Sequence, residues 1–129
     1  MYLDGAIYHP NQPAQEERLA HPPDRLCRII VYAISIVFDV EAAALRMQTR
    51  GSADIAFARQ VAMYLAHVGC GLSLSDTGRL FGRDRTTVAH ACSLVEDRRD
   101  DARIDRTLDL LEAVVGRLAG VRLALRQLN

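Results

Sequence analysis

This sequence has no lysine and no tryptophan, and only seven of its 129 residues are aromatic. The hydrophobic core must therefore be built mainly from leucine, valine, isoleucine and alanine. A composition rich in alanine and leucine and poor in glycine favours helices. The length suggests a single domain. All sixteen basic residues are arginines, which a GC-rich coding sequence explains without any functional role. Arginine is also the better residue for forked contacts with phosphate and guanine.

The few cysteines and histidines and the lack of a long apolar run also exclude whole classes of function. The cysteines, Cys27, Cys70 and Cys92, are widely spaced, so we expect free thiols and neither a zinc site nor a disulfide framework. The histidines follow no ligand spacing and no nucleophile–base pair stands out, so we expect no metal, no cofactor and no enzymatic activity. The longest apolar run, residues 29–40, is too short to cross a bilayer. No secretory signal is visible, so a cytoplasmic protein is expected.

Charge is balanced over the whole chain but not along it. Residues 1–24 contain one arginine against four acidic residues, residues 25–95 contain eight against five, and residues 96–129 contain seven of each sign. A mildly basic centre thus lies between an acidic arm and a neutral tail. All four prolines lie within residues 1–23, which we interpret as a flexible arm. The net charge of zero argues against a strong non-specific nucleic-acid binder.

The remaining chain predicts an all-α fold of about six helices. Helical spacing of apolar residues indicates helices over 24–38, with Asp24 as N-cap, and over 53–68, with a short helix over 40–47 between them. The 53–68 helix is expected to bury Phe57, Val61, Tyr64, Leu65 and Val68. Gly69-Cys70-Gly71 ends it. A charged stretch over 96–103 should lead to a last helix from Ile104 to about Leu128.

Residues 73–95 have the pattern of a helix-turn-helix. Ser73 and Asp76 form a capping-box pattern ahead of a very short helix, Gly78 would let two helices approach closely, and Gly82 stops the short helix. A longer helix begins near Asp84. The inward residues are expected to be Leu74, Thr77, Gly78 and Phe81 in the short helix, and Val88, Ala91, Cys92 and Val95 in the longer one.

The opposite face of the longer helix offers the small, hydrogen-bonding side chains that a major-groove surface needs, because a bulky apolar face cannot read base edges. It consists of Thr86, His90, Ser93 and Asp97, with Arg85 in the exposed first turn. An ordinary solvated face has the same spacing, so periodicity alone leaves both interpretations open.

A longer signature resembles a known family. Residues 58–65 (ARQVAMYL), Ser73-Leu74 with Gly78, and residues 81–92 (FGRDRTTVAHAC) together resemble the C-terminal DNA-binding domain of the bacterial replication initiator DnaA, over about residues 25–117. The resemblance implies an all-α helix-turn-helix bundle, similar to the Trp-repressor class. It implies that the partner is double-stranded DNA, with the recognition helix in the major groove.

The resemblance also assigns roles to residues. Base edges or adjacent phosphates would be contacted from the recognition helix by Asp84, Arg85, Thr86, Thr87 and His90. Arg59 and Gln60 would hold the DNA backbone from the 53–68 helix. Arg79 and Arg83 are additional phosphate candidates from charge and position alone.

Each assignment has a plainer alternative. Asp84 can cap its helix through the amide of Thr86 or Thr87. Arg59 and Gln60 can be ordinary solvated side chains, and His90 can belong to the core. Cys92 is interpreted as a core residue rather than as a ligand or a redox group.

Three departures from the family pattern affect what the chain can do. There is no phosphate-binding glycine loop and no ATPase module, so we expect no nucleotide binding and no initiator activity of its own. The family's histidine between the aspartate and the two threonines is Arg85 here, and one glycine of the preceding pair is missing. The family's minor-groove arginine has no clean equivalent, because Gly51 falls at the aligned place with Arg50 beside it. The DNA sequence that is read is therefore open.

These features favour a sequence-specific transcription regulator, and family analogy extends this to activators of phage-like or gene-transfer-agent genes. One alternative is a replication modulator that competes for initiator sites. Another is a protein-interaction module that has lost DNA binding.

We divide the chain into an arm (1–23), a DNA-binding domain (24–117) and a C-terminal helical extension (118–129). The apolar stripe of the last helix consists of Ile104, Leu108, Leu111, Val115, Leu118, Val121, Leu125 and Leu128. Up to residue 117 it is expected to pack on the domain's first helix. Beyond that point it could form a homodimer or dock a transcription-machinery partner such as a polymerase subunit.

Overall fold

A computed structural model describes residues 23–47 and 52–127, with the side chains of residues 25–47, 52–120 and 127. Every regular element in these ranges is a helix, which confirms the all-α prediction. In chain order they are α2 (Pro23–Phe38), α3 (Ala42–Arg46), α4 (Ala53–Tyr64), α5 (Leu74–Phe81), α6 (Arg85–Arg98) and α7 (Ala102–Gln127). The helix α4 continues into a π-helix, η1 (Leu65–Gly69). None of these helices is both long and apolar enough to cross a membrane.

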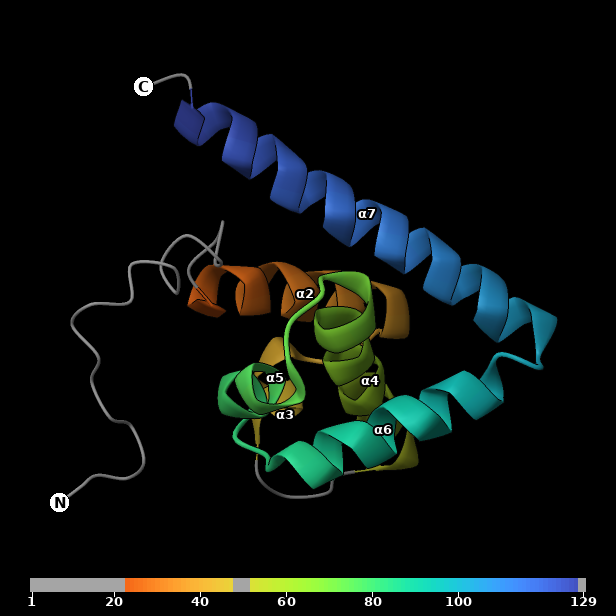
Figure 1. Ribbon diagram of the computed structural model, residues 1–129. Helices are drawn as coiled ribbons and strands as arrows, with labels where there is room; N and C mark the ends of the chain where they lie inside the picture. The colour runs from red at the N-terminus through yellow and green to blue at the C-terminus, as the bar shows by residue number, and fades with distance from the viewer. Residues whose placement is uncertain (1–22, 48–51, 128–129) are drawn as a thin grey trace, which may run out of the picture.

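The helix α4 is the centre of the bundle (Figure 1). It packs against α2 on one side and α6 on the other, and α7 crosses over α2. Residues 61–66, which span the end of α4 and the start of η1, are all buried. A helix that is apolar all round must be covered on every side, and this requirement explains why the neighbouring helices surround α4.

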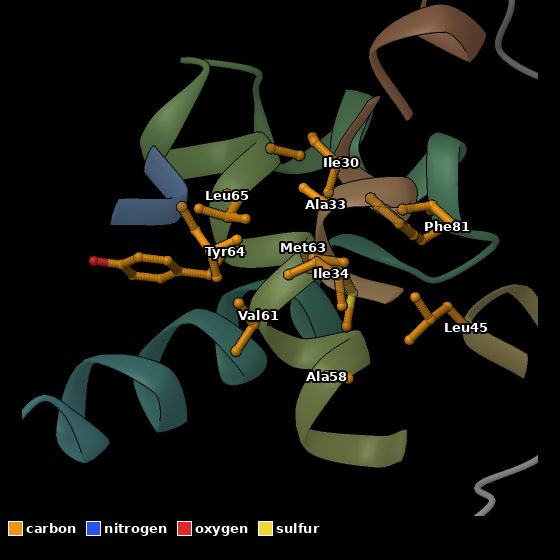
Figure 2. Packing of buried hydrophobic residues seen from close by; sticks show 14 of the residues in the cluster. Ile30, Ala33, Ile34, Leu45, Ala58, Val61, Met63, Tyr64, Leu65 and Phe81 are labelled. Carbon is orange, nitrogen blue, oxygen red and sulfur yellow. The ribbon is translucent and has the colours of Figure 1, made fainter. Parts of the chain in front are cut away.

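Branched aliphatic side chains fill the centre of the core (Figure 2), and Cys27 and Met63 add sulfur-containing side chains to the cluster. Ile30 and Ile34 of α2 face Val61 and Met63 of α4, and all four are at most 2% exposed. Tyr64 is oriented differently from these side chains: its ring points away from the cluster, with the hydroxyl outermost. Fully burying an aliphatic side chain of this size contributes roughly 1.5–3 kcal/mol, so the core dominates the stability of the domain.

Several helix boundaries differ from the sequence-based expectation. Since α2 begins at Pro23, Asp24 lies inside the first turn and is not the N-cap; proline is favoured at a first helical position. The charged stretch over 96–103 is mostly helical, because α6 runs to Arg98 and α7 begins at Ala102. Val68 is 48% exposed, since the wider π-turn of η1 changes the helical register. Of the predicted arm (residues 1–23), residues 1–22 lie outside the described residues, and Pro23 is the first residue of α2. Arg50, Gly51 and Leu128 also lie outside the described residues.

The first half of α7 packs on α2 as predicted, with Leu108, Leu111 and Val115 buried. Leu118 is 48% exposed, so the packed stripe ends before it. The helix runs without interruption across residues 117 and 118, so the boundary drawn there falls inside one element. The side chains of Val121 and Leu125 lie outside the described part of the chain.

The corner between α6 and α7 is held by Arg99, the C-cap residue of α6. Its guanidinium donates to Asp105 at 2.7 Å, to Asp109 at 3.0 Å and to Glu112 at 2.7 Å, all on α7, and to the Tyr64 hydroxyl at 3.1 Å. Burial lowers the pKa of Arg99, but the hydrogen bonds to the carboxylates and to Tyr64 outweigh this and raise it. Because hydrogen bonds between charged groups are about twice as strong as neutral ones, this joint fixes the direction of α7 relative to α6.

The turn between α5 and α6 is very tight. Gly82 ends α5 in the left-handed conformation, with φ 64° and ψ 37°, which glycine adopts without steric cost. The Arg83 amide donates to the Gly78 carbonyl at 2.9 Å, which brings the start of α6 onto α5. A Cβ atom on Gly78 would lie 2.3 Å from the Arg83 carbonyl oxygen. Residue 78 must therefore be glycine for this turn to close.

We expect Gly78→Ala to lower the free energy of unfolding by roughly 1–3 kcal/mol, because the clash is with backbone rather than with a flexible side chain. Urea unfolding followed by circular dichroism measures this. Gly116→Ala is the matched control: Gly116 lies in α7 with no atom within 4 Å of an added Cβ. There the exchange should raise stability by roughly 0.5–1 kcal/mol through helix propensity. Equal effects at the two sites would contradict the close approach at Gly78.

We expect Thr77→Val to stabilise the protein by about 1 kcal/mol. Thr77 is fully buried in α5, and its hydroxyl has no hydrogen-bond partner within the described residues. Valine keeps the shape and removes a polar group that burial penalises. Thr77→Ser, which keeps the hydroxyl and deletes the methyl group, should destabilise the protein in the same unfolding assay. A destabilising Thr77→Val would show that the hydroxyl is satisfied.

Candidate nucleic-acid interface

The helix α6 has the two faces that its sequence predicts. Val88, Ala91 and Val95 are buried against the bundle, and Cys92 is half-buried. The opposite face is exposed and consists of Arg85, Thr86, Ala89, His90, Ser93 and Asp97. His90 is therefore not a core residue. No other element of the described chain covers this face in Figure 1, so it is open along the helix.

Asp84 caps the N-terminus of α6. Its Oδ1 atom accepts hydrogen bonds from the Thr87 amide at 2.8 Å and from the Thr86 hydroxyl at 2.6 Å. These bonds stabilise the carboxylate, the one from the Thr86 side chain most, and lower the pKa of Asp84. The capping interpretation is thus confirmed through the Thr87 amide. It also fixes the Thr86 side chain at the first turn of α6.

Arg85 and His90 are exposed side chains of α6 that no carboxylate engages among the residues that the structure describes. Arg85 is the first residue of the helix, directly after the cap. His90 lies five residues further on, roughly 140° around the helix axis from Arg85, so the two side chains stand at opposite margins of the exposed face. Between them stands Ala89, whose small side chain leaves the backbone accessible. A planar group such as a base edge can approach this part of α6 closely.

The helix α5 contributes one exposed arginine. Arg79 forms an ion pair with Asp76, three residues earlier, and 75% of its side chain is exposed. Exposed pairs of this kind contribute little to stability, so Arg79 can exchange its partner for another anion at little cost. Ser73 caps α5 by accepting a hydrogen bond from the Asp76 amide at 3.0 Å, as the capping-box pattern predicts. Gln60 is half-buried on α4, between the buried Arg59 and Val61.

Arg59 and Arg83 are placed differently from the expectation that they meet phosphate from the surface. Arg59 is only 6% exposed, and its guanidinium donates to the carbonyls of Leu45 at 3.1 Å and Ala44 at 2.9 Å. Arg83 is half-buried and donates to the Met47 carbonyl at 3.0 Å. The alternative that Arg59 is an ordinary solvated side chain is also wrong. Both side chains face the end of α3, where the last carbonyls of a helix lack full helical pairing; the Ala44 carbonyl also accepts from the Met47 amide at 3.3 Å.

Sequence reasoning missed the end of α3 as part of this region. Its contribution comes from main-chain carbonyls of residues 44, 45 and 47, which no side-chain pattern reveals. The only available signal was the shortness of α3, since a five-residue helix needs outside partners for nearly all its carbonyls. The structure thus brings together three elements: the N-terminus of α6, the turn before it and the end of α3.

We expect Asp84→Ala to lower the stability of the protein, because the Thr87 amide loses its acceptor, while Asp84→Asn keeps an acceptor and most of the stability. The folded-state pKa of Asp84 lies below its ordinary value, so the carboxylate's contribution is complete at neutral pH and is lost as the pH falls through the folded-state pKa. Urea unfolding of the three proteins at neutral and strongly acidic pH measures both effects. Equal stability of Asp84→Ala and wild type at neutral pH would contradict the capping role.

Comparison with known proteins finds relatives that match the region just described. The family described as the bacterial dnaA protein helix-turn-helix matches residues 27–95, more than half of the chain. The chain is also similar to proteins named chromosomal replication initiator protein DnaA. It is 38% identical to that of Lachnoclostridium phytofermentans over 85 residues, which are 64% of this chain and 18% of the relative. It is 49% identical to that of Bordetella pertussis over 65 residues, which are 49% of this chain and 14% of the relative.

The chain thus spans less than a fifth of the length of these relatives. The matched residues contain α5, the tight turn and the first eleven residues of α6, together with the central helix α4. They include the cap, the glycine contact and the exposed face that were described above. The chain belongs to the bacterial DnaA helix-turn-helix family.

Proposed function

We propose that this chain is a sequence-specific regulator of transcription that binds double-stranded DNA with α6 in the major groove. The observation that carries the proposal is the open face of α6, which begins at a capped helix N-terminus and presents an arginine, threonine and histidine side chains. A helix N-terminus favours phosphate oxygens next to it. The side chains one and two turns further on are then at the right depth to contact base edges.

In this proposal the contacts divide into two groups. Arg85, Thr86, Thr87 and His90 contact base edges or adjacent phosphates, and Asp84 holds the first turn in place for them. Arg79 of α5 and Gln60 of α4 contact the DNA backbone, where they set the register of the protein without reading sequence. The small share of the initiator's length that the chain matches leaves ATP-dependent functions out of this proposal.

A second candidate function is a replication modulator that occupies initiator sites, because the relatives are named as replication initiators. The two candidates differ in the DNA that is bound. A modulator must prefer the initiator's own site, whereas a regulator of phage-like or gene-transfer-agent genes reads operators of its own. Arg85 favours the regulator, because an arginine fork in place of the family's histidine matches O6 and N7 of guanine.

Selection of bound duplexes from a random pool tests the proposal directly. We expect the wild-type protein to select a motif that shares part of the initiator's site and has guanine where Arg85 contacts the groove. Arg85→His should relax or switch the preference at that one base pair, with about 1–3 kcal/mol at stake, and leave the other positions unchanged. Arg106→His, on the exposed surface of α7, is the control and should select the wild-type motif.

Two results would count against this proposal. Identical motifs from wild type and Arg85→His would show that Arg85 does not read a base. Failure of the wild-type protein to enrich any motif above random DNA would contradict sequence-specific binding altogether. It would favour the interpretation as a protein-interaction module.

A further inference from the structure

Two arginines, one from α4 and one from the turn between α5 and α6, converge on the end of α3. Arg59, from α4, donates through Nε to the Leu45 carbonyl and through Nη2 to the Ala44 carbonyl. Arg83, from the turn before α6, donates through Nη2 to the Met47 carbonyl. The final carbonyls of α3 and the one just beyond it therefore accept hydrogen bonds from side chains of α4 and of the α5–α6 turn.

Arg83 acts as a bridge because a guanidinium has donors on two sides. While Nη2 bonds Met47, Nη1 donates to the carbonyls of Phe81 at 3.2 Å and Gly82 at 3.3 Å. One planar group thus connects the last residues of α5 to the end of α3. Asp84 and Arg85 follow it directly in the chain, so the start of α6 is connected to α3 through a single side chain.

Arg59, on α4, stabilises the same end of α3 through its hydrogen bonds to the Leu45 and Ala44 carbonyls. The helix is only five residues long, which is too short to be stable by itself, and its carbonyl end is the negative end of its dipole. Burial lowers the pKa of Arg59, and the nearby Arg83 guanidinium lowers it further. Two cations are thus held close together. The carbonyl oxygens that both arginines bond offset their mutual repulsion.

We propose that Arg59 and Arg83 are positioning residues of the DNA interface, which join the end of α3 to the turn before α6 and do not neutralise phosphates. This rests on the proposed function, because the interface that they position is the face of α6. Binding a phosphate would require either side chain to leave its carbonyls. The carbonyls of Leu45 and Met47 would then lose the arginine donors, and the Ala44 carbonyl would keep only the Met47 amide.

The proposal distinguishes the fork of arginine from its charge. A lysine keeps the positive charge and can still bind a phosphate, but its single ammonium cannot span Met47 on one side and Phe81 and Gly82 on the other. We therefore expect Arg83→Lys to lower affinity for the selected duplex roughly tenfold. Affinity for random duplex and the dependence of binding on salt should stay as in the wild type. Arg106→Lys, on the surface of α7, should change none of these quantities.

The experiment is a fluorescence-anisotropy titration of selected and random duplexes over a range of salt, at a temperature where circular dichroism shows each variant folded. Arg59→Lys is the second variant, with the same expectation for the ratio of specific to random binding. Amide hydrogen exchange of the DNA-free proteins is measured in parallel. We expect faster exchange in the first turn of α6 in Arg83→Lys and unchanged exchange in Arg106→Lys.

Three results would overturn the positioning role. Wild-type affinity of Arg83→Lys, with a salt slope that falls by about 0.9 in Arg83→Ala, would identify a phosphate ligand. A less stable but folded Arg83→Lys with an unchanged ratio of specific to random binding would identify a purely structural side chain. If the wild type itself did not prefer the selected duplex, the proposed function would fail, and the positioning role with it. That result is distinguishable because it does not depend on any variant.

Discussion

The close approach of Gly78 to the Arg83 backbone is the constraint on which the functional end of this domain depends. It allows α5 and α6 to be joined by a turn in which Gly82 alone adopts a left-handed conformation. The direction of α6 follows from that turn, because the Arg83 amide is bonded back to Gly78. Once residue 83 is fixed, Asp84 is in place to cap α6 and the Arg83 side chain can reach Met47. A larger residue at position 78 would therefore displace the helix, its cap and the contact to α3 together.

The parts of the fold that depend on local sequence could be predicted, and those that depend on distant backbone could not. The helical spacing of apolar residues predicted α2, α4 and the packing of α7, since one buried face repeats every 3.6 residues. The cap at Asp84 and the stop at Gly82 followed from short-range geometry. The faces of α6 were correct for the same reason. The extent of helix within the charged stretch over 96–103 was missed, because the carboxylates that pair with Arg99 only come together in the folded corner.

The placement of Arg59 and Arg83 shows that an arginine can be engaged by main-chain carbonyls, a use that charge alone does not reveal. In a chain without lysine, every structural task that needs a cation falls to arginine. Arg99 satisfies three carboxylates at the α6–α7 corner, Arg98 stacks 4.4 Å over the ring of Phe57, and Arg59 bonds two carbonyls. These uses exploit the planar fork and the ring-stacking face, which do not require solvent. Within the basic centre of the sequence, Arg59 is thus buried and Arg83 half-buried, while Arg79 and Arg85 are among the arginines that remain exposed.

Folding does not explain the arginine at position 85. The N-terminus of a helix carries the positive end of the dipole, so a cation at the first position opposes folding by roughly 0.3–1 kcal/mol at an exposed site. Its neighbour Asp84 supplies a negative charge, but the hydrogen bonds of that carboxylate go to Thr86 and Thr87. The side chain of Arg85 is exposed and packs into no part of the core. Residues that contradict local preferences without a compensating contact are those most often retained for binding. This argument supports the proposal that Arg85 contacts a partner outside the protein, through the exposed face of α6.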